Sequence, residues 1–203
     1  MGTQTKKVAF HTLGCKLNFS ETSTISRDFL KHGFEKVKFD ELADFYILNT
    51  CSVTENADKE AKKIIRKAKR INPYAKVVVI GCFAQLKPES ITKIEEVDLV
   101  LGANEKFDVL KYIDGSSIGS PSKILNADVE SIKEFKPSFS LEERTRSYLK
   151  VQDGCDYTCS FCTIPLARGN SRSGKIFSIV NAANKIASSG KKEIVLTGVN
   201  IGD

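Results

Sequence analysis

The stretch Val77-Val78-Val79-Ile80-Gly81-Cys82 is a run of four β-branched apolar residues that ends on a glycine and a cysteine. β-branched residues favour strands, and a continuous apolar run is typical of a strand that is buried on both faces. Residues 7–13, 45–48 and 97–102 form three similar apolar runs. Strands of this kind, separated by helical stretches, predict an α/β domain with a parallel sheet covered on both faces.

Helices are predicted between these strands from the spacing of apolar residues and from their end signals. The first begins at Asn18 or Ser20 and runs to about His32, where Gly33 stops it. Further helices are predicted over 54–70, which Asn72-Pro73 ends, and near 106–113, and residues 41–44 are predicted to form a turn. Together these elements form a predicted Rossmann-like domain over residues 1–114.

Three cysteines lie just past predicted strand ends: Cys15, Cys51 and Cys82. Parallel sheets bind ligands in the crevice beyond the carboxyl ends of their strands. The topology is therefore expected to bring these distant cysteines to one edge of the sheet. Buried structural cysteines would more often fall inside strands or helices, although a coincidence of positions is the alternative.

The second half of the chain is predicted to be a linker followed by another domain. Residues 115–143 are low in apolar side chains and read as a linker, with a short strand near 131–135. The domain over 144–203 is predicted to contain a first strand around 148–151, a helix over 176–188 and a strand over 193–198. Gly190 is the predicted stop of that helix.

Three more cysteines, Cys155, Cys159 and Cys162, stand at C-x3-C-x2-C spacing directly after the first strand of this second domain. Thiolates this close can face one inorganic centre, and the irons of iron–sulfur clusters are usually held by cysteine thiolates. Since a cubane cluster has four irons, three cysteines leave one iron free for a small molecule. A structural zinc ion normally has four ligands, so a zinc loop completed from elsewhere, or a set of buried free thiols, is the alternative.

Composition narrows the class of protein. Of the 203 residues, 41% are hydrophobic, enough for a core, and no run approaches the roughly 18 apolar residues of a membrane span. Residues 1–7 lack the apolar segment of a secretory signal, so a cytoplasmic location is predicted. Cytosolic thiols stay reduced, which favours metal or cluster ligation over disulfides. The net charge of +6 is compatible with an RNA partner, as it is with many other soluble domains.

The C-x3-C-x2-C motif, with the aromatic Phe161 before its third cysteine, resembles the signature of radical S-adenosylmethionine enzymes. The resemblance implies that Phe161 contacts the cofactor. In that family the open iron binds S-adenosylmethionine, and an electron from the cluster cleaves it to a 5′-deoxyadenosyl radical. The resemblance implies that the motif follows the first strand of a partial (β/α) barrel. Because a complete barrel takes about 250 residues, residues 144–203 are expected to hold only its first part, as in a fragment or a truncated gene.

Both cysteine sets together are similar to the methylthiotransferases, radical S-adenosylmethionine enzymes that replace C–H with C–S–CH3. The amino-terminal domain of that family carries three cysteines for a second cluster, which correspond here to Cys15, Cys51 and Cys82. The resemblance implies two 4Fe-4S clusters, S-adenosylmethionine as cosubstrate, and an electron donor such as flavodoxin. It implies no catalytic side chain beyond the cluster ligands.

The motif Leu13-Gly14-Cys15-Lys16-Leu17-Asn18 is most similar to the branch that acts on threonylcarbamoyl-adenosine 37, in the anticodon loop of tRNA. The branches that act on isopentenyl-adenosine of tRNA or on an aspartate of a ribosomal protein are alternatives. From another class, a non-catalytic iron–sulfur or zinc module is a further alternative.

A few other residues are candidates for cofactor contacts. The resemblance places Gly198 and Asn200 where the superfamily contacts the amino group of S-adenosylmethionine, although a plain strand-to-loop turn explains them equally. Arg168 and Arg172 suit the cofactor carboxylate or an RNA phosphate, with a solvated loop charge as the alternative. The lysine-rich helix face over 59–70 is interpreted as solvated rather than RNA-binding, His11 as a packed residue, and His32 as a helix-end residue.

Overall fold

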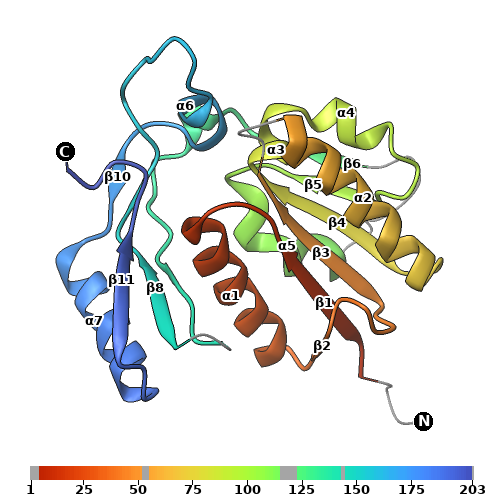
Figure 1. The fold of residues 1–203 in the computed structure, drawn as a ribbon, viewed down its shortest axis with the longest axis horizontal. Coiled ribbons are helices and arrows are strands. Elements are labelled where there is room, and N and C mark those ends of the chain that lie inside the picture. Colours follow the sequence, from red (N-terminus) through yellow and green to blue (C-terminus); the bar gives the residue numbers. More distant parts are fainter. Residues whose placement is uncertain (1–4, 52–54, 115–122, 143–144, 203) are drawn as a thin grey trace.

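The computed structural model describes residues 5–51, 55–114, 123–142 and 145–202. Two sheets lie on either side of one helix, α1 (Figure 1). The larger sheet has six parallel strands in the order β2-β1-β3-β4-β5-β6. Its strands are β1 (Lys7–Thr12), β2 (Glu35–Val37), β3 (Phe45–Thr50), β4 (Lys76–Gly81), β5 (Leu99–Leu101) and β6 (Lys123–Leu125).

Alternation along the strands assigns each face of the large sheet to its own helices. In β4, Val77 and Val79 belong to one buried cluster, and Val78 and Ile80 belong to the other. The first cluster includes residues of α2 (Glu55–Ile71), α3 (Cys82–Leu86) and α4 (Pro88–Thr92). The second includes residues of α1 (Lys16–Lys31) and α5 (Val109–Asp114), which follows the 3-10 turn η1 (Glu105–Asp108). Successive strand residues point to opposite faces, so continuous apolar runs build both cores at once, and the predicted α/β class is confirmed.

The smaller sheet is formed by the second half of the chain. Its order is β11-β8-β7, with β8 (Arg146–Lys150) parallel to β11 (Glu193–Thr197) and antiparallel to β7 (Ser138–Phe139). The helix α7 (Ile176–Ser188) connects β8 to β11 and packs on β8 through Ile186. This is one βαβ unit, as expected for residues 144–203. Between β8 and α7 lie β9 (Gln152–Asp153), α6 (Ile164–Arg168) and β10 (Arg172–Ser173).

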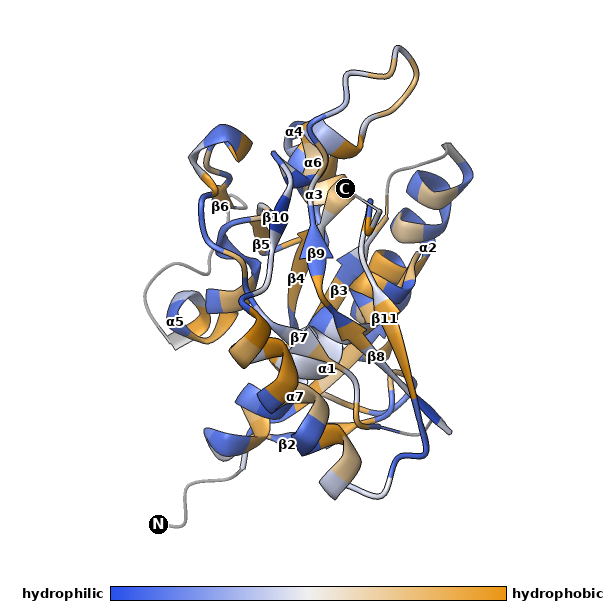
Figure 2. Ribbon diagram, turned by 90° about the vertical axis from the view of Figure 1, so that its left-hand side faces the viewer, coloured by the Kyte–Doolittle hydropathy of each residue, from blue (hydrophilic) through white to orange (hydrophobic). Residues whose placement is uncertain are grey.

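The outer surface of this βαβ unit is apolar. Figure 2 shows apolar stretches along α7 and β11. The side chains of Ile176, Phe177 and Leu196 on these elements are exposed. Exposed apolar side chains gathered on neighbouring elements are typical of a surface that contacts other segments or partners.

The helix α1 is buried between the two sheets. Its apolar residues Ile25 and Phe29 pack on the large sheet. Its opposite side is polar yet buried and meets β7, where the Arg27 guanidinium donates to the Phe139 carbonyl at 2.8 Å and lies 4.3 Å from the ring centroid. The Thr24 hydroxyl accepts the Phe139 N–H at 3.1 Å. The two halves of the chain are therefore joined through the polar side of this helix.

Several predicted boundaries need correction. Neither Asn18 nor Ser20 begins the first helix, because α1 starts at Lys16 with Cys15 as its N-cap; Asn18 is buried inside the first turn. The helix ends as predicted, with His32 as its C-cap and Gly33 at φ +83°. The predicted strand near 131–135 is wrong, because the only regular structure there is the 3-10 turn η2 (Val129–Ser131).

The predicted linker contributes to both sheets, through β6 in the large one and β7 in the small one. Residues 115–122 of that linker, the predicted helix start at Thr54 and the predicted second-domain start at Arg144 lie outside the described residues. Within the described part of the chain, no helix is long and apolar enough to cross a membrane.

Candidate metal centre

Cys15, Cys51 and Cys82 lie past the carboxyl ends of three neighbouring strands. Cys15 follows β1 and caps α1, Cys51 follows β3, and Cys82 follows β4 as the first residue of α3. All three line one cavity of about 630 Å³. In a sheet of order 2-1-3-4-5 the connections reverse direction between β1 and β3, and ligands bind at this point. The topology thus brings the predicted cysteines to the place where the fold favours a ligand.

Two glycines make the sharp turns that carry cysteines to this edge. Gly14 has φ +100°, and a Cβ atom there would lie 2.6 Å from the Cβ of Cys51. Gly81 has φ +97°, and its Cβ would lie 2.4 Å from the Thr50 carbonyl oxygen. Side chains are disfavoured by both the backbone conformation and the lack of space. The Gly-Cys pairs at 14–15 and 81–82 therefore reflect the geometry of the turns.

Asn18 holds the cysteine turns together, a role that the sequence analysis missed. Its side-chain N–H groups donate to the carbonyls of Leu13 at 2.8 Å and Thr50 at 3.2 Å, which precede Cys15 and Cys51 closely in the chain. Its carbonyl oxygen accepts from the Arg168 guanidinium at 2.6 Å. The available signal was its place in the motif around Cys15, but an asparagine near a helix start indicates a cap more simply.

The opposite wall of the cavity comes from the second half of the chain. It includes Arg168 and Ile164 of α6, Tyr148 of β8, and residues 196–199 and Ile201 at and after the end of β11. The predicted residues Arg168 and Gly198 therefore share a cavity with the amino-terminal cysteines. The helices α3, which begins with Cys82, and α6 also pack against each other.

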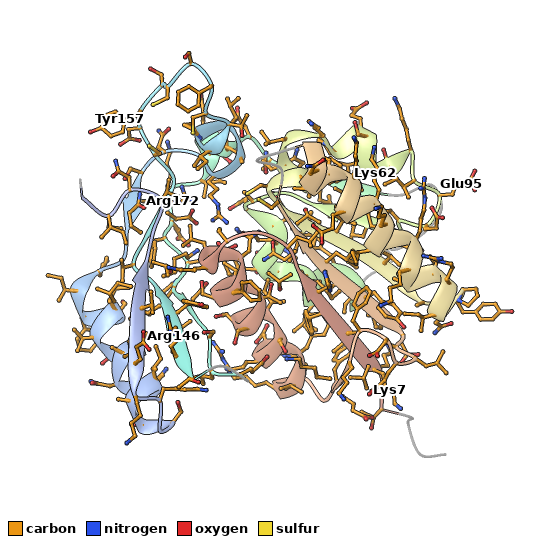
Figure 3. The ribbon with its side chains drawn as sticks, in the orientation of Figure 1. Lys7, Lys62, Glu95, Arg146, Tyr157 and Arg172 are labelled. Carbon is orange, nitrogen blue, oxygen red and sulfur yellow. The ribbon has the colours of Figure 1, made fainter. Side chains whose placement is uncertain are left out.

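The C-x3-C-x2-C motif lies on a loop that projects from the body above α6 (Figure 1). Cys155 is anchored by its N–H, which donates to the Gly169 carbonyl at 3.0 Å, and the Cys162 N–H donates to the Cys159 carbonyl at 3.1 Å. Cys159 is exposed, whereas Cys155 and Cys162 are half-buried. The predicted cofactor contact Phe161 is 90% exposed, and Tyr157 stands on the same loop (Figure 3).

Gln152 links the start of this loop to the predicted cofactor contacts after β11. Its amide N–H group donates to the carbonyl of Gly154 at 2.7 Å. Its carbonyl oxygen accepts the N–H groups of Val199 at 2.7 Å and Asn200 at 2.9 Å. Asn200 is thereby fixed beside the strand that leads into the cysteine loop, although it is not among the residues that line the cavity.

Behind the cavity lies a buried ionic cluster, which we define as Glu21, Lys106, Lys150, Asp153, Arg168 and Arg172. Glu21 of α1 is fully buried, and its carboxylate binds Lys106 at 2.8 Å and both Lys150 and Arg168 at 3.1 Å. Asp153 binds Arg168 at 2.9 Å, Lys150 at 3.2 Å and Arg172 at 3.4 Å. Arg168 is 3% exposed, so the alternative of a solvated loop charge is wrong for this residue.

The ionic cluster keeps its carboxylates charged. Burial opposes the ionisation of Glu21, yet Arg168, Lys106 and Lys150 together hold its pKa well below the ordinary value. Burial likewise opposes ionisation of Asp153, and Lys150 and Arg168 lower its pKa further than burial raises it. Burial lowers the pKa of Lys106, with Glu21 acting in the opposite direction. For Arg168, burial lowers the pKa, but the carboxylates of Glu21 and Asp153 outweigh burial and raise it.

The amino-terminal cysteines fit an iron–sulfur cluster better than a single ion. Two sulfurs on one zinc ion are at most about 4.6 Å apart, because each Zn–S bond is about 2.3 Å. Within the described ranges, no three His, Cys, Asp or Glu side chains are grouped as ligands of one ion. Three cysteines that line one side of a cavity of about 630 Å³ instead suit a larger group whose irons are each held by a different thiolate.

The remaining predicted residues within the described ranges do not line the cavity. His11 is half-buried, with its ring 5.1 Å from that of Phe39, and burial lowers its pKa. On α2, Lys59, Lys63 and Arg66 are exposed, as expected of a solvated face. Arg172 is partly buried and donates to the Arg168 and Asn170 carbonyls, both at 2.7 Å.

Comparison with known proteins gives consistent matches. Residues 7–102 match the model of a family described as uncharacterized protein family UPF0004. The chain is 40% identical over 197 residues to the threonylcarbamoyladenosine tRNA methylthiotransferase MtaB of Aquifex aeolicus, covering 96% of this chain and 48% of that protein. It is 42% identical to the protein of the same name from Bacillus subtilis, covering 96% and 44%.

A more distant match is the ribosomal protein uS12 methylthiotransferase RimO of Bdellovibrio bacteriovorus, which is 34% identical over 95% of this chain and 43% of that protein. The chain thus spans about half the length of the curated relatives it matches. Residues 7–102 form a UPF0004 domain, and the resemblance of the chain to the methylthiotransferases is confirmed.

The turn at Gly14 leads to a first prediction. Gly14→Ala should destabilise the protein more than Gly33→Ala. Both residues have positive φ, which costs a side chain about 1–2 kcal/mol, but a Cβ at Gly33 meets no atom within 4 Å, whereas one at Gly14 collides with Cys51. Urea unfolding of both variants measures the difference. Equal losses would mean that Gly14 serves only the backbone conformation.

The ionic cluster leads to a second prediction, on acid stability. Glu21 and Asp153 have depressed pKa values in the folded state, so their contribution to stability is present above their unfolded values of about 4 and is lost as the pH falls below them. Between pH 6 and pH 3 the free energy of unfolding should fall more steeply for the unchanged protein than for Glu21→Gln. Each unit of pKa difference corresponds to about 1.4 kcal/mol.

The control for this titration is Glu193→Gln, which removes an exposed carboxylate that lies 3.4 Å from Arg146. Its pH dependence should match that of the unchanged protein, because exposed pairs contribute little. Parallel curves for all three proteins would show that Glu21 does not carry the acid sensitivity.

Proposed function

We propose, on the premise of this similarity to methylthiotransferases, that the chain is the cluster-binding part of an enzyme that adds a methylthio group to carbon 2 of threonylcarbamoyl-adenosine 37 in tRNA. The observation that carries the proposal is the cavity shared by Cys15, Cys51 and Cys82 with the segment after β11. The relatives named as acting on threonylcarbamoyladenosine are 38–42% identical to the chain, against 33–34% for those with other named substrates. This difference favours the threonylcarbamoyl-adenosine branch.

Two 4Fe-4S clusters and S-adenosylmethionine are the proposed cofactors, with one cluster held by each cysteine set and an electron donor such as flavodoxin. When bound, the clusters would supply the electron that cleaves S-adenosylmethionine and the iron that carries the sulfur to be transferred. The C–H bond at carbon 2 of adenine is not acidic, so a side chain acting as a general base cannot activate it. This explains why no catalytic acid or base is proposed here.

The residues of the chain position the cysteines and form the walls of the cavity. Gly14 and Gly81 turn Cys15 and Cys82 toward the cavity, and Asn18 fixes the turns before Cys15 and Cys51. Gln152 joins the start of the Cys155 loop to the segment at Val199 and Asn200. We propose that Gly198 lets the cofactor approach the backbone, since a Cβ there would already lie 2.7 Å from Ile201 and leaves no room for a side chain.

The exposed loop around Phe161 is the proposed place where S-adenosylmethionine and the tRNA anticodon loop meet the cluster of Cys155, Cys159 and Cys162. Cys159 and Phe161 are accessible, as a site with an open iron requires. Reduced thiols and a tRNA substrate both fit a location in the cytoplasm.

Cluster number gives a third prediction. Anaerobic reconstitution of the intact protein should load about eight irons per chain, since each cysteine set suits one cubane. Changing Cys155, Cys159 and Cys162 together to Ala should remove about half of the iron, and changing the other three cysteines should remove the other half. Full iron content in either triple variant would contradict the assignment of the clusters.

The two cysteine sets lead to a fourth prediction, on activity. In the intact protein, Cys159→Ala should abolish cleavage of S-adenosylmethionine to 5′-deoxyadenosine. Cys51→Ala should keep this cleavage but form no methylthio-adenosine in tRNA, because the sulfur site is lost while the first cluster stays intact. Mass spectrometry of digested tRNA and a count of 5′-deoxyadenosine measure both. Normal methylthiolation by Cys51→Ala would refute the sulfur-carrying role of the amino-terminal cysteines.

A further inference from the structure

The charges of the buried ionic cluster do not cancel. The amino-terminal half contributes Glu21 and Lys106, one carboxylate and one ammonium group. The second half contributes Asp153 against three cations, Lys150, Arg168 and Arg172. Two carboxylates therefore face four cations, an excess of two positive charges, all of it contributed by the second half. Lys106 and Lys150 are almost fully buried, so water does not solvate them.

An uncompensated buried charge is strongly unfavourable, and natural structures compensate it with a partner or a bound ion. Arg168 is the member of the ionic cluster that lines the cavity. From there it binds Glu21 and Asp153 on one side, and on the other it shares the cavity with Cys15, Cys51 and Cys82. Through Arg168, the positively charged ionic cluster therefore adjoins the cavity that the amino-terminal cysteines line.

We propose that an anionic occupant of this cavity docks the two halves of the chain, with Arg168 as the positioning residue that couples occupancy to docking. The proposal rests on the function proposed above, in which the occupant is an iron–sulfur cluster held by Cys15, Cys51 and Cys82. Three thiolates carry more negative charge than the two positive charges of an oxidised cubane core, so the bound group is an anion. Held by the amino-terminal half, this anion supplies the negative charge that balances the excess positive charge of the second half.

Coupling of this kind is reciprocal. If the occupant strengthens the contact between the halves, then the docked second half strengthens binding of the occupant. The contact also fixes the Cys155 loop, because Asp153 precedes that loop and Arg168 ends the helix after it. Occupancy of the amino-terminal cysteine site would thus fix the position of the Cys155 loop. The sulfur site would then be filled before the two cysteine sites are aligned.

Hydrogen exchange tests this coupling. The sample is the full-length protein with Cys155, Cys159 and Cys162 all changed to Ala, so that only the amino-terminal cysteines can bind a cluster. Exchange of α1 and α6 amides is measured before and after anaerobic reconstitution, alongside iron content. Loading should slow exchange of these amides about tenfold, within the usual range of coupling between sites. Amides of α7, which packs on β8 away from the cavity, should not change.

Variants that change the charge of the ionic cluster should shift the exchange difference between loaded and empty protein in opposite directions. Arg168→Gln removes one excess charge and should shrink the difference between loaded and empty protein, as should Arg172→Gln at a more exposed position. Glu21→Gln adds one excess charge and should enlarge the difference, mainly by faster exchange in the empty protein. A merely structural role would weaken the contact in all variants alike. Arg146→Gln is the matched control, since Arg146 is exposed at the far end of the small sheet (Figure 3).

The outcomes separate the two proposals. If the amino-terminal cysteines bind no iron, both the cluster assignment and the coupling are refuted. If iron loads but exchange of α1 and α6 is unchanged, or if Glu21→Gln and Arg168→Gln shift the difference in the same direction, only the coupling is refuted. Loading with opposite shifts in these two variants supports it.

Discussion

The carboxylate of Glu21 is the group on which the arrangement of the two halves depends. It is fully buried on α1, and its cations come from η1, β8 and α6. A buried ion that loses its partners typically costs 3–5 kcal/mol, so these three segments must stay close to the helix for the charge to be tolerated. At an apolar interface, the two halves could shift relative to each other at a smaller cost in free energy. The ionic cluster therefore fixes the orientation of the second half as well as its contact.

The elements that the sequence predicts well are those whose signal is local. Apolar runs such as 77–80 identify buried strands, and the helix over 176–188 is recovered with its stop at Gly190. The short β2 and the helices α3, α4 and α6 escape prediction, because three to five residues carry too little periodicity to be distinguished from loops. The strands β6 and β7 lie in a polar segment and are recruited by pairing with existing sheet edges.

The candidate site was only partly predictable for a related reason. The positions of the cysteines follow from strand ends and topology, which are properties of the sequence pattern. The roles of Asn18 and Glu21 do not follow from the sequence pattern, because their partner Arg168 is about 150 residues away in the chain. In the sequence, both residues look like ordinary polar positions of a surface helix. In the folded chain that surface is covered by the second sheet. Buried polar residues at an interface reveal themselves only when the covering segment is in place.

The location of the cavity follows from these constraints. A parallel sheet opens a crevice at its carboxyl edge, and in this chain α6 and the segment after β11 form the opposite wall of that crevice. Each half thus contributes one wall, and each wall carries a different chemistry: thiols from the sheet edge, and a guanidinium with backbone groups from the second half. A site built in this way is complete only when the halves are docked. The same contact that buries Glu21 therefore also decides whether the amino-terminal cysteines share a two-walled cavity with Arg168 or form one open wall alone.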